Sequence, residues 1–262
     1  MTAAVSAAAI GPLAPVLGAL SAMTGQYPVH GLVDGLYLTE RAGWVPAERI
    51  VSGDGFDDLL DAAVRRWDAP PHVAGALAWK CYAYWVSLPA VLGYATARRV
   101  PLLVPSQVLV RYVDHQPFLC AGLLAPRLAV LPGDPLAALD LPGVTVVDDE
   151  AALLGELRAT LLDAHLAPLV ERMHNRLRLG RRTLWGSLAA GVAHGVSRAA
   201  DVLPGSTLDV TTTLLSSLGL GELVDLTAHP TGRLTVNRRT CCLAFGLPKT
   251  KICTGCVIQT AR

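Results

Sequence analysis

The sequence predicts an α+β protein, in which an N-terminal half of helices with a small antiparallel sheet precedes a mainly helical C-terminal half. Three observations support this class. Ala- and Leu-rich runs with helical spacing occur in both halves, and short β-branched runs bounded by Pro, Gly and Asp lie between residues 101 and 147. Of the 262 residues, 52% are hydrophobic and 16% are charged, which supplies a buried core and excludes a disordered chain.

The texture of the sequence changes near residue 150 and predicts two lobes. A mixed α/β lobe is expected over residues 1–149 and a helical lobe over residues 150–262, either as separate units or as one continuous domain. The second lobe ends in the segment 238–262, which holds four of the six cysteines. We expect this segment to carry the chemistry of the protein.

The first lobe alternates helices with short strands. Residues 36–38 and 44–45 flank a polar stretch and predict a β-hairpin. Residues 57–67 predict a helix, because aspartates occupy its first turn and arginines its last, where they complement the helix dipole. A mostly buried helix is expected over residues 72–97, after a Pro-Pro pair. Three short strands are expected beyond it, at residues 108–113, 129–131 and 144–147.

The second lobe is dominated by helical spacing. The apolar residues between 150 and 177 predict one amphipathic helix bent at Pro168. Further elements are expected as a helix at 183–202, a helix at 207–218 and a strand at 233–237. The first of these helices contains Gly186, Gly191 and Gly195. Glycine lowers the stability of a helix, so these three positions predict that another element packs closely there.

Charge and hydropathy argue against nucleic-acid binding and against a transmembrane span. Lys and Arg number 22 and Asp and Glu 21, a net charge of +1, so no nucleic acid is expected. Residues 2–33 lack charged side chains but contain prolines and no basic start of a signal peptide. Residues 81–97 are uncharged but shorter than the ~20 residues of a bilayer span. We therefore expect no transmembrane span and a cytoplasmic location, with peripheral association at the inner face of the membrane left open.

Four cysteines are crowded into one short segment. Cys241 and Cys242 are adjacent, and ten residues separate them from Cys253, which forms a Cys-x-x-Cys pair with Cys256. Four thiols make a soft sulfur site, which suits zinc or an iron-sulfur cluster. The Cys-x-x-Cys pair favours zinc, whereas adjacent cysteines diverge and fit one small tetrahedral ion poorly. No βαβ unit supports a redox dithiol, and the polar surroundings disfavour inert core cysteines. Spacing alone leaves zinc and cluster equally open.

The residues around the cysteines extend this pattern. Arg238, Arg239 and Thr240 lead into Cys-Cys-x10-Cys-x2-Cys, and residues 184–187 read Leu-Trp-Gly-Ser. The segment resembles the C-terminus of the FhuF-like ferric-siderophore reductases, and the second stretch is similar to their Leu-Trp-Gly-Asn, from which Ser187 departs. The resemblance implies a 2Fe-2S cluster on all four cysteines.

The resemblance also implies a reaction. It is the transfer of one electron to a ferric siderophore, with a hydroxamate as the expected chelator, followed by release of Fe(II). A hard oxygen chelate binds Fe(III) far better than Fe(II), so reduction frees the iron and spares the chelator. Because the sequence shows no dinucleotide fingerprint, the electron is expected from a separate ferredoxin or NAD(P)H-linked reductase.

Several residues are candidates for docking the substrate or the donor. Residues 171–262 carry 12 basic and 5 acidic side chains. Arg238, Arg239, Lys249 and Lys251 flank the two cysteine pairs, where they could attract an anionic chelate or an acidic donor, although a solvated face is the simpler interpretation of each. Trp185 either packs near the cluster or belongs to the core.

A second class of function stays open at this stage. The cysteine segment could be a non-enzymatic module, in which zinc or a sensing cluster stabilises the tail and mediates association. Colour separates a 2Fe-2S protein, which is reddish-brown, from a zinc protein, which is colourless. Cys81 and Cys120 lie in apolar runs and are interpreted as small core residues.

Overall fold

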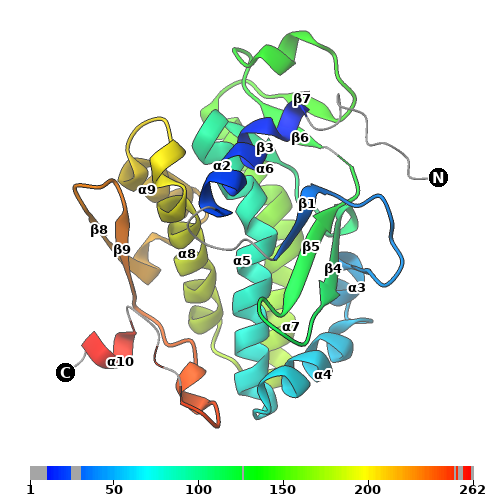
Figure 1. Ribbon diagram of the computed structural model, residues 1–262, viewed down its shortest axis with the longest axis vertical. Helices are drawn as coiled ribbons and strands as arrows, with labels where there is room; N and C mark the ends of the chain where they lie inside the picture. Colours follow the sequence, from blue (N-terminus) through cyan, green and yellow to red (C-terminus); the bar gives the residue numbers. More distant parts are fainter. Residues whose placement is uncertain (1–10, 25–30, 126, 251, 253–255, 261–262) are drawn as a thin grey trace.

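Helix α5 (Pro71–Ala97) is the axis of the fold. The computed structural model describes residues 11–24, 31–125, 127–250, 252 and 256–260. In Figure 1 a four-stranded sheet lies on one side of α5, whereas helix α8 (Arg181–Arg198) and a β-hairpin lie on the other. The class is α+β, as the sequence predicts.

Local sequence defines both ends of α5. Pro71 occupies the first turn, where its missing N–H costs nothing, and Pro70 precedes it in an extended conformation. Arg98 takes a left-handed conformation at the C-terminus, and its N–H donates to the carbonyl of Tyr94 at 3.0 Å. Nearly every side chain between these ends is buried, which agrees with the expected buried helix. Among the described helices, none is long and apolar enough to cross a membrane.

Helix α8 runs parallel to α5 and touches it along its length. Trp79 Nε1 donates to the carbonyl of Leu184 at 2.7 Å near the start of the pair. Farther along, a Cβ added at Gly191 would lie 3.5 Å from the Tyr84 ring, and one at Gly195 would lie 2.9 Å from Leu88 Cδ1. The close packing predicted from the helical glycines is therefore confirmed at Gly195, whereas the contact at Gly191 is an ordinary one that also leaves room for a Cβ.

The sheets are mixed rather than purely antiparallel. The larger has the order β1 (Leu32–Tyr37), β5 (Leu119–Leu123), β4 (Val108–Tyr112) and β2 (Val45–Pro46). Strand β1 is parallel to β5, and the other pairs are antiparallel. The predicted hairpin between residues 36–38 and 44–45 is wrong, because β5 and β4 lie between these two segments. The smaller sheet contains β3 (Arg99–Pro101), β6 (Leu128–Val130) and β7 (Val144–Val146).

The remaining described helices follow the expected positions, except for a short helix at residues 47–52 that was not predicted. Those before α5 are α2 (Ala14–Thr24), α3 (Ala47–Ser52) and α4 (Phe56–Trp67). The run from 150 to 177 consists of α6 (Glu150–Leu157), the π-helical segment η4 (Arg158–Leu166) and α7 (Ala167–Leu177). The hydrogen-bond pattern thus widens just before Pro168, where the sequence predicts a bend. Helix α9 (Thr207–Ser217) packs against α8.

The core extends through both predicted lobes. One large cluster of buried apolar residues includes members of α2, α5, α7 and α8 and of strands in the four-stranded and three-stranded sheets. A second, small cluster joins Ala69, Val73 and Leu77 at the start of α5 to Cys242 and Ala244. The division at residue 149 stays a prediction, whereas the small cluster shows that the cysteine segment packs on the N-terminal end of α5.

Candidate metal centre

A β-hairpin carries the chain along α8 toward the cysteines. Strand β8 (Val224–Ala228) pairs antiparallel with β9 (Leu234–Arg238). Leu234, Val236 and Arg238 alternate on the buried face of β9. The N–H of Leu234 donates to Ser197 Oγ at 2.9 Å, and Arg238 Nη2 donates to Ser187 Oγ at 2.8 Å. Because these contacts lie ten residues apart on α8, β9 is held antiparallel to that helix.

The residue before the first cysteine is fixed against a glycine. A Cβ added at Gly186 would lie 2.0 Å from Thr240 Oγ1 and 2.8 Å from Thr240 Cβ. Thr240 is buried in this contact, which only a residue without a side chain allows. The close packing predicted from Gly186 is thus confirmed, and its partner is the cysteine segment rather than another helix. This contact places Cys241 directly beside α8.

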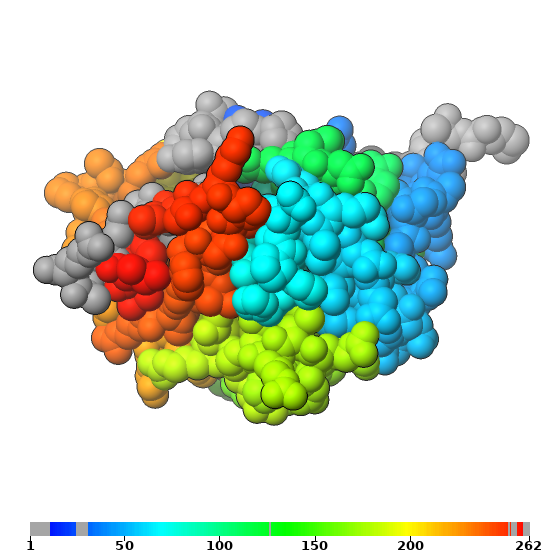
Figure 2. Space-filling view, turned by 90° about the horizontal axis from the view of Figure 1, so that it is seen from below, coloured from blue at the N-terminus to red at the C-terminus, as the bar shows by residue number. Residues whose placement is uncertain are grey.

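The two adjacent cysteines have different surroundings. Cys241 is half-buried, and its Sγ accepts a hydrogen bond from the N–H of Leu243 at 3.3 Å. This turn is possible because Leu243 takes a left-handed conformation with φ of 60°. Cys242 is buried in the small cluster at the start of α5. Figure 2 shows the segment, in orange-red, beside the cyan start of α5 and the yellow-green turn into α8.

The second cysteine pair is described only in part. Cys256 is buried and precedes the short helix α10 (Val257–Thr260), while Cys253 and Lys251 lie outside the described residues. Cys241 and Cys256 are free thiols. Among the described residues, no three His, Cys, Asp or Glu side chains gather as a metal site. The donor chemistry suits a soft metal, since the thiols are sheltered and one accepts a backbone N–H, but the four-cysteine set stays a prediction.

The predicted docking residues that the structure describes lie in different environments. Arg238 is buried with 6% of its surface exposed, so its guanidinium cannot be reached by a docked partner. Arg239 is half-exposed and binds both carboxylate oxygens of Asp225 through Nε at 3.0 Å, which lowers the pKa of that carboxyl. Lys249 is exposed. Trp185 packs edge-on against the buried Trp79 at 6.4 Å between ring centroids, as expected of a residue at the edge of the core.

Comparison with known proteins decides the family. The profile of the family described as ferric iron reductase FhuF-like transporter matches residues 78–217, which is more than half of the chain. The chain belongs to this FhuF-like family. The match includes α8 with Gly186 and Ser187, the residues that hold the cysteine segment, whereas the cysteines lie beyond it. A search of curated proteins gives no significant match.

This FhuF-like protein also gathers basic groups beside β9. Burial, together with the positive charges of Arg198, Lys80 and Arg238, lowers the pKa of His194 to about 4. Arg198 Nη1 in turn donates to Tyr84 Oη at 2.8 Å. Sequence reasoning did not find this group, because its members are spread over three elements. The sequence did hold a signal for the burial of Arg238, which is in phase with Leu234 and Val236 on an alternating strand.

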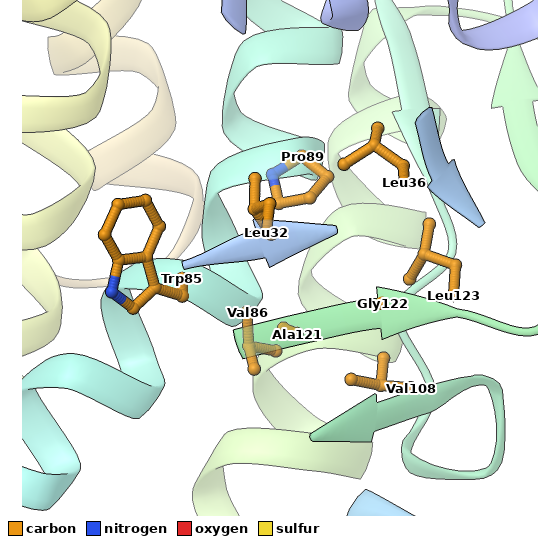
Figure 3. A pocket seen from close by; sticks show the side chains of 9 residues that line it. All are labelled: Leu32, Leu36, Trp85, Val86, Pro89, Val108, Ala121, Gly122 and Leu123. Carbon is orange, nitrogen blue, oxygen red and sulfur yellow. The ribbon is translucent and has the colours of Figure 1, made fainter. Parts of the chain in front are cut away.

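Two hollows of the FhuF-like fold are lined by none of the cysteines. The first is an apolar gap of about 10 Å³ between α5 and the four-stranded sheet, lined by Trp85, Pro89, Leu123 and their neighbours (Figure 3). It has room for no more than about one water molecule. The second, about 440 Å³, is an open depression between α9 and β8 that includes Glu222. Neither combines the size and the positive charge that an anionic ferric chelate requires.

Proposed function

We propose that this chain is a ferric iron reductase in which Cys241, Cys242, Cys253 and Cys256 bind one 2Fe-2S cluster. The observation that carries the proposal is the attachment of the cysteine segment to α8, through Thr240 on Gly186, because α8 belongs to the part that matches the family. The cysteine spacing gives independent support, since it repeats the complete pattern of the resembled reductases. The substrate is Fe(III) held by a siderophore, with a hydroxamate as the expected chelator.

The residues around the cysteines have separate tasks in this function. A bound 2Fe-2S cluster supplies a one-electron carrier whose potential depends on charge, on hydrogen bonds to sulfur and on exposure. The N–H of Leu243 lowers the electron density on the Cys241 sulfur by donating to it. The apolar cluster around Cys242 excludes water from that thiol. One electron from a donor protein would reduce the Fe(III) of the chelate to Fe(II). The freed hydroxamates would take up protons from water, so no acid or base of the protein is required.

The surface of the cysteine segment suits contact with partners. Phe245, Ile252 and Ile258 are large apolar side chains with 48%, 52% and 44% of their surfaces exposed. Lys249 lies among them and is exposed as well. An apolar centre with a charged rim is typical of protein interfaces. We propose that an acidic ferredoxin or an NAD(P)H-linked reductase docks here in the cytoplasm, and that the ferric siderophore approaches the same surface.

The cofactor is tested by anaerobic purification followed by iron, sulfide and zinc analysis. About two iron and two sulfide per chain and a reddish-brown spectrum are expected. Single Cys→Ser variants at the four positions should lose or bleach the colour. Matched Cys81→Ser and Cys120→Ser variants should keep it, because these thiols lie in the helical and sheet parts of the fold. About one zinc without iron or sulfide would refute the cluster and favour the non-enzymatic module.

The substrate is tested with the chemically reduced protein. Anaerobic mixing with a ferric hydroxamate should reoxidise it, and a ferrous chelator should report the released Fe(II). The Ga(III) complex of the same hydroxamate is the matched control, because gallium has the same charge and cannot accept the electron. Reoxidation no faster with the ferric complex than with the gallium complex would remove siderophores from the proposal while leaving the cluster in place.

A further inference from the structure

A buried arginine with unsatisfied donors stands where the cysteine segment begins. Arg238 is the last residue of β9. Its Nη2 donates to Ser187 Oγ at 2.8 Å and lies 3.4 Å from Thr240 Oγ1. Its Nε and Nη1 are buried and have no hydrogen-bond partner among the described residues. Because a guanidinium stays charged in proteins, two nitrogens of a cation are here withdrawn from water without an acceptor.

This arrangement is costly unless an anion is brought to it. A buried charged donor without an acceptor destabilises the fold, because it loses its hydration and gains no hydrogen bond in return. Within the described part of the chain, Arg238 forms no ion pair. The charged side chains that act on His194 beside it, Lys80 and Arg198, are cations as well. Helices α5 and α8 and strand β9 contain no Asp or Glu, so these elements supply no counter-charge.

The next residue shows that the fold can compensate such a charge. Arg239 is half-exposed, and Asp225 on the neighbouring strand β8 meets it with both carboxylate oxygens. The exposed arginine is therefore paired, whereas the buried one is not. This is the reverse of what stability alone would favour, since burial raises the cost of an unpaired charge.

We propose that Arg238 is the counter-ion of the four-cysteine centre, an inference that rests on the proposed function. Cys241 and Cys242 follow Arg238 by three and four residues, and thiolates are the anions that the chain itself can bring to this place. Four thiolates with two ferric ions and two sulfides carry a net negative charge, which grows by one on reduction. The guanidinium therefore favours the reduced state and positions the segment; it does not take part in the chemistry at iron.

The first test compares Arg238→Gln with Arg239→Gln in the iron-loaded full chain. Arg238→Gln should weaken the preference for the reduced state about tenfold, which is about 59 mV for one electron. Arg239→Gln removes the same formal charge one residue away, but this guanidinium is half-exposed and screened by water, so the potential of the centre should change much less. Arg238→Lys should recover part of the shift. Equal shifts for the two Gln variants, or none, would overturn the inference.

A second measurement separates a counter-ion from a purely structural arginine. Arg238→Met should lower the melting temperature of the iron-loaded chain. It should not lower that of the full chain purified without iron, because there the buried charge of Arg238 has no counter-charge and destabilises the fold. Ser187→Ala, which removes only the hydrogen bond, should lower both and leave the potential unchanged. If Arg238→Met lowers both melting temperatures equally, the role is structural. A parent protein without iron and sulfide would instead overturn the proposed function.

Discussion

Replacement of Gly186 by Ala tests how the cysteine segment is held to α8. The new Cβ would lie 2.0 Å from Thr240 Oγ1 and 2.8 Å from its Cβ and Cγ2. Carbon and oxygen atoms rest at about 3.5 Å or more, so Thr240 would have to retreat by about 1.5 Å. Overpacking costs about 1–3 kcal/mol, against which Ala gains about 1 kcal/mol over Gly in a helix. We expect a net loss of up to about 2 kcal/mol in the free energy of unfolding.

The control for this variant is Gly191→Ala on the same helix. There the new Cβ would meet the Tyr84 ring at 3.5 Å, an ordinary contact, so the helix gain remains and stability should rise by up to about 1 kcal/mol. Thermal unfolding should separate the two variants by several degrees, at about 2–4 °C per kcal/mol for a chain of this size. Iron content should fall for Gly186→Ala alone. Equal stability and equal iron content in the two variants would refute the proposed anchoring.

Two further predictions concern pH and salt. Burial lowers the pKa of His165 to about 4, whereas a histidine in the unfolded chain has a pKa of about 6.5. Between these two pH values the unfolded state binds a proton at this residue and the folded state does not. The free energy of unfolding should therefore fall as the pH drops from about 6.5 to 4. Urea unfolding at pH 7 and pH 5 measures this, and a His165→Asn variant with the same slope as the parent would contradict it. Lys249→Glu should slow electron transfer from an acidic donor at low salt, and the difference should vanish near 1 M, where the Debye length is about 3 Å. Arg127→Glu, beside the smaller sheet, is the control, and an equal effect there would show that only net charge matters.

The helices could be predicted because their signals are local. The buried helix α5 follows from a long apolar run with prolines at its start. The glycines of α8 predict that another element packs closely, although they do not identify it. Gly191 and Gly195 turned out to face α5, whereas Gly186 faces Thr240. The spacing of a helix tells where contact occurs but not which element makes it, because the partner lies far away in sequence.

The pairing of the strands was predicted wrongly because the true partners are also far apart in sequence. The segments at 36–38 and 44–45 are neighbours in sequence, which favours a hairpin, but β4 and β5 arrive about seventy residues later and separate them. Strand β5 was missed because Gly122 interrupts its apolar run and resembles a turn. In the structure a Cβ at Gly122 would lie 2.8 Å from Leu38 Cγ, so the glycine serves close packing in the sheet.

The cysteines of the candidate site could be predicted from their spacing, whereas the environment of the nearby arginines depends on burial. The cysteine pattern is readable because ligand spacing is a property of the chain itself, although Cys253 lies outside the described residues. The environment of the charged residues near the cysteines cannot be predicted from spacing, because a guanidinium can face either water or the interior. Arg238 and Arg239 are adjacent and identical in type, and the alternation of β9 sends one inward and the other outward.

The separation of the two apolar clusters bears on how the cysteine segment can open by itself. The large cluster contains none of the cysteines at 241, 242 and 256, whereas Cys242 belongs to the small cluster at the start of α5. Local opening of a protein costs only the contacts that the opening segment makes. Detachment of the cysteine segment would therefore expose its cysteines while helices α5 and α8 stay assembled.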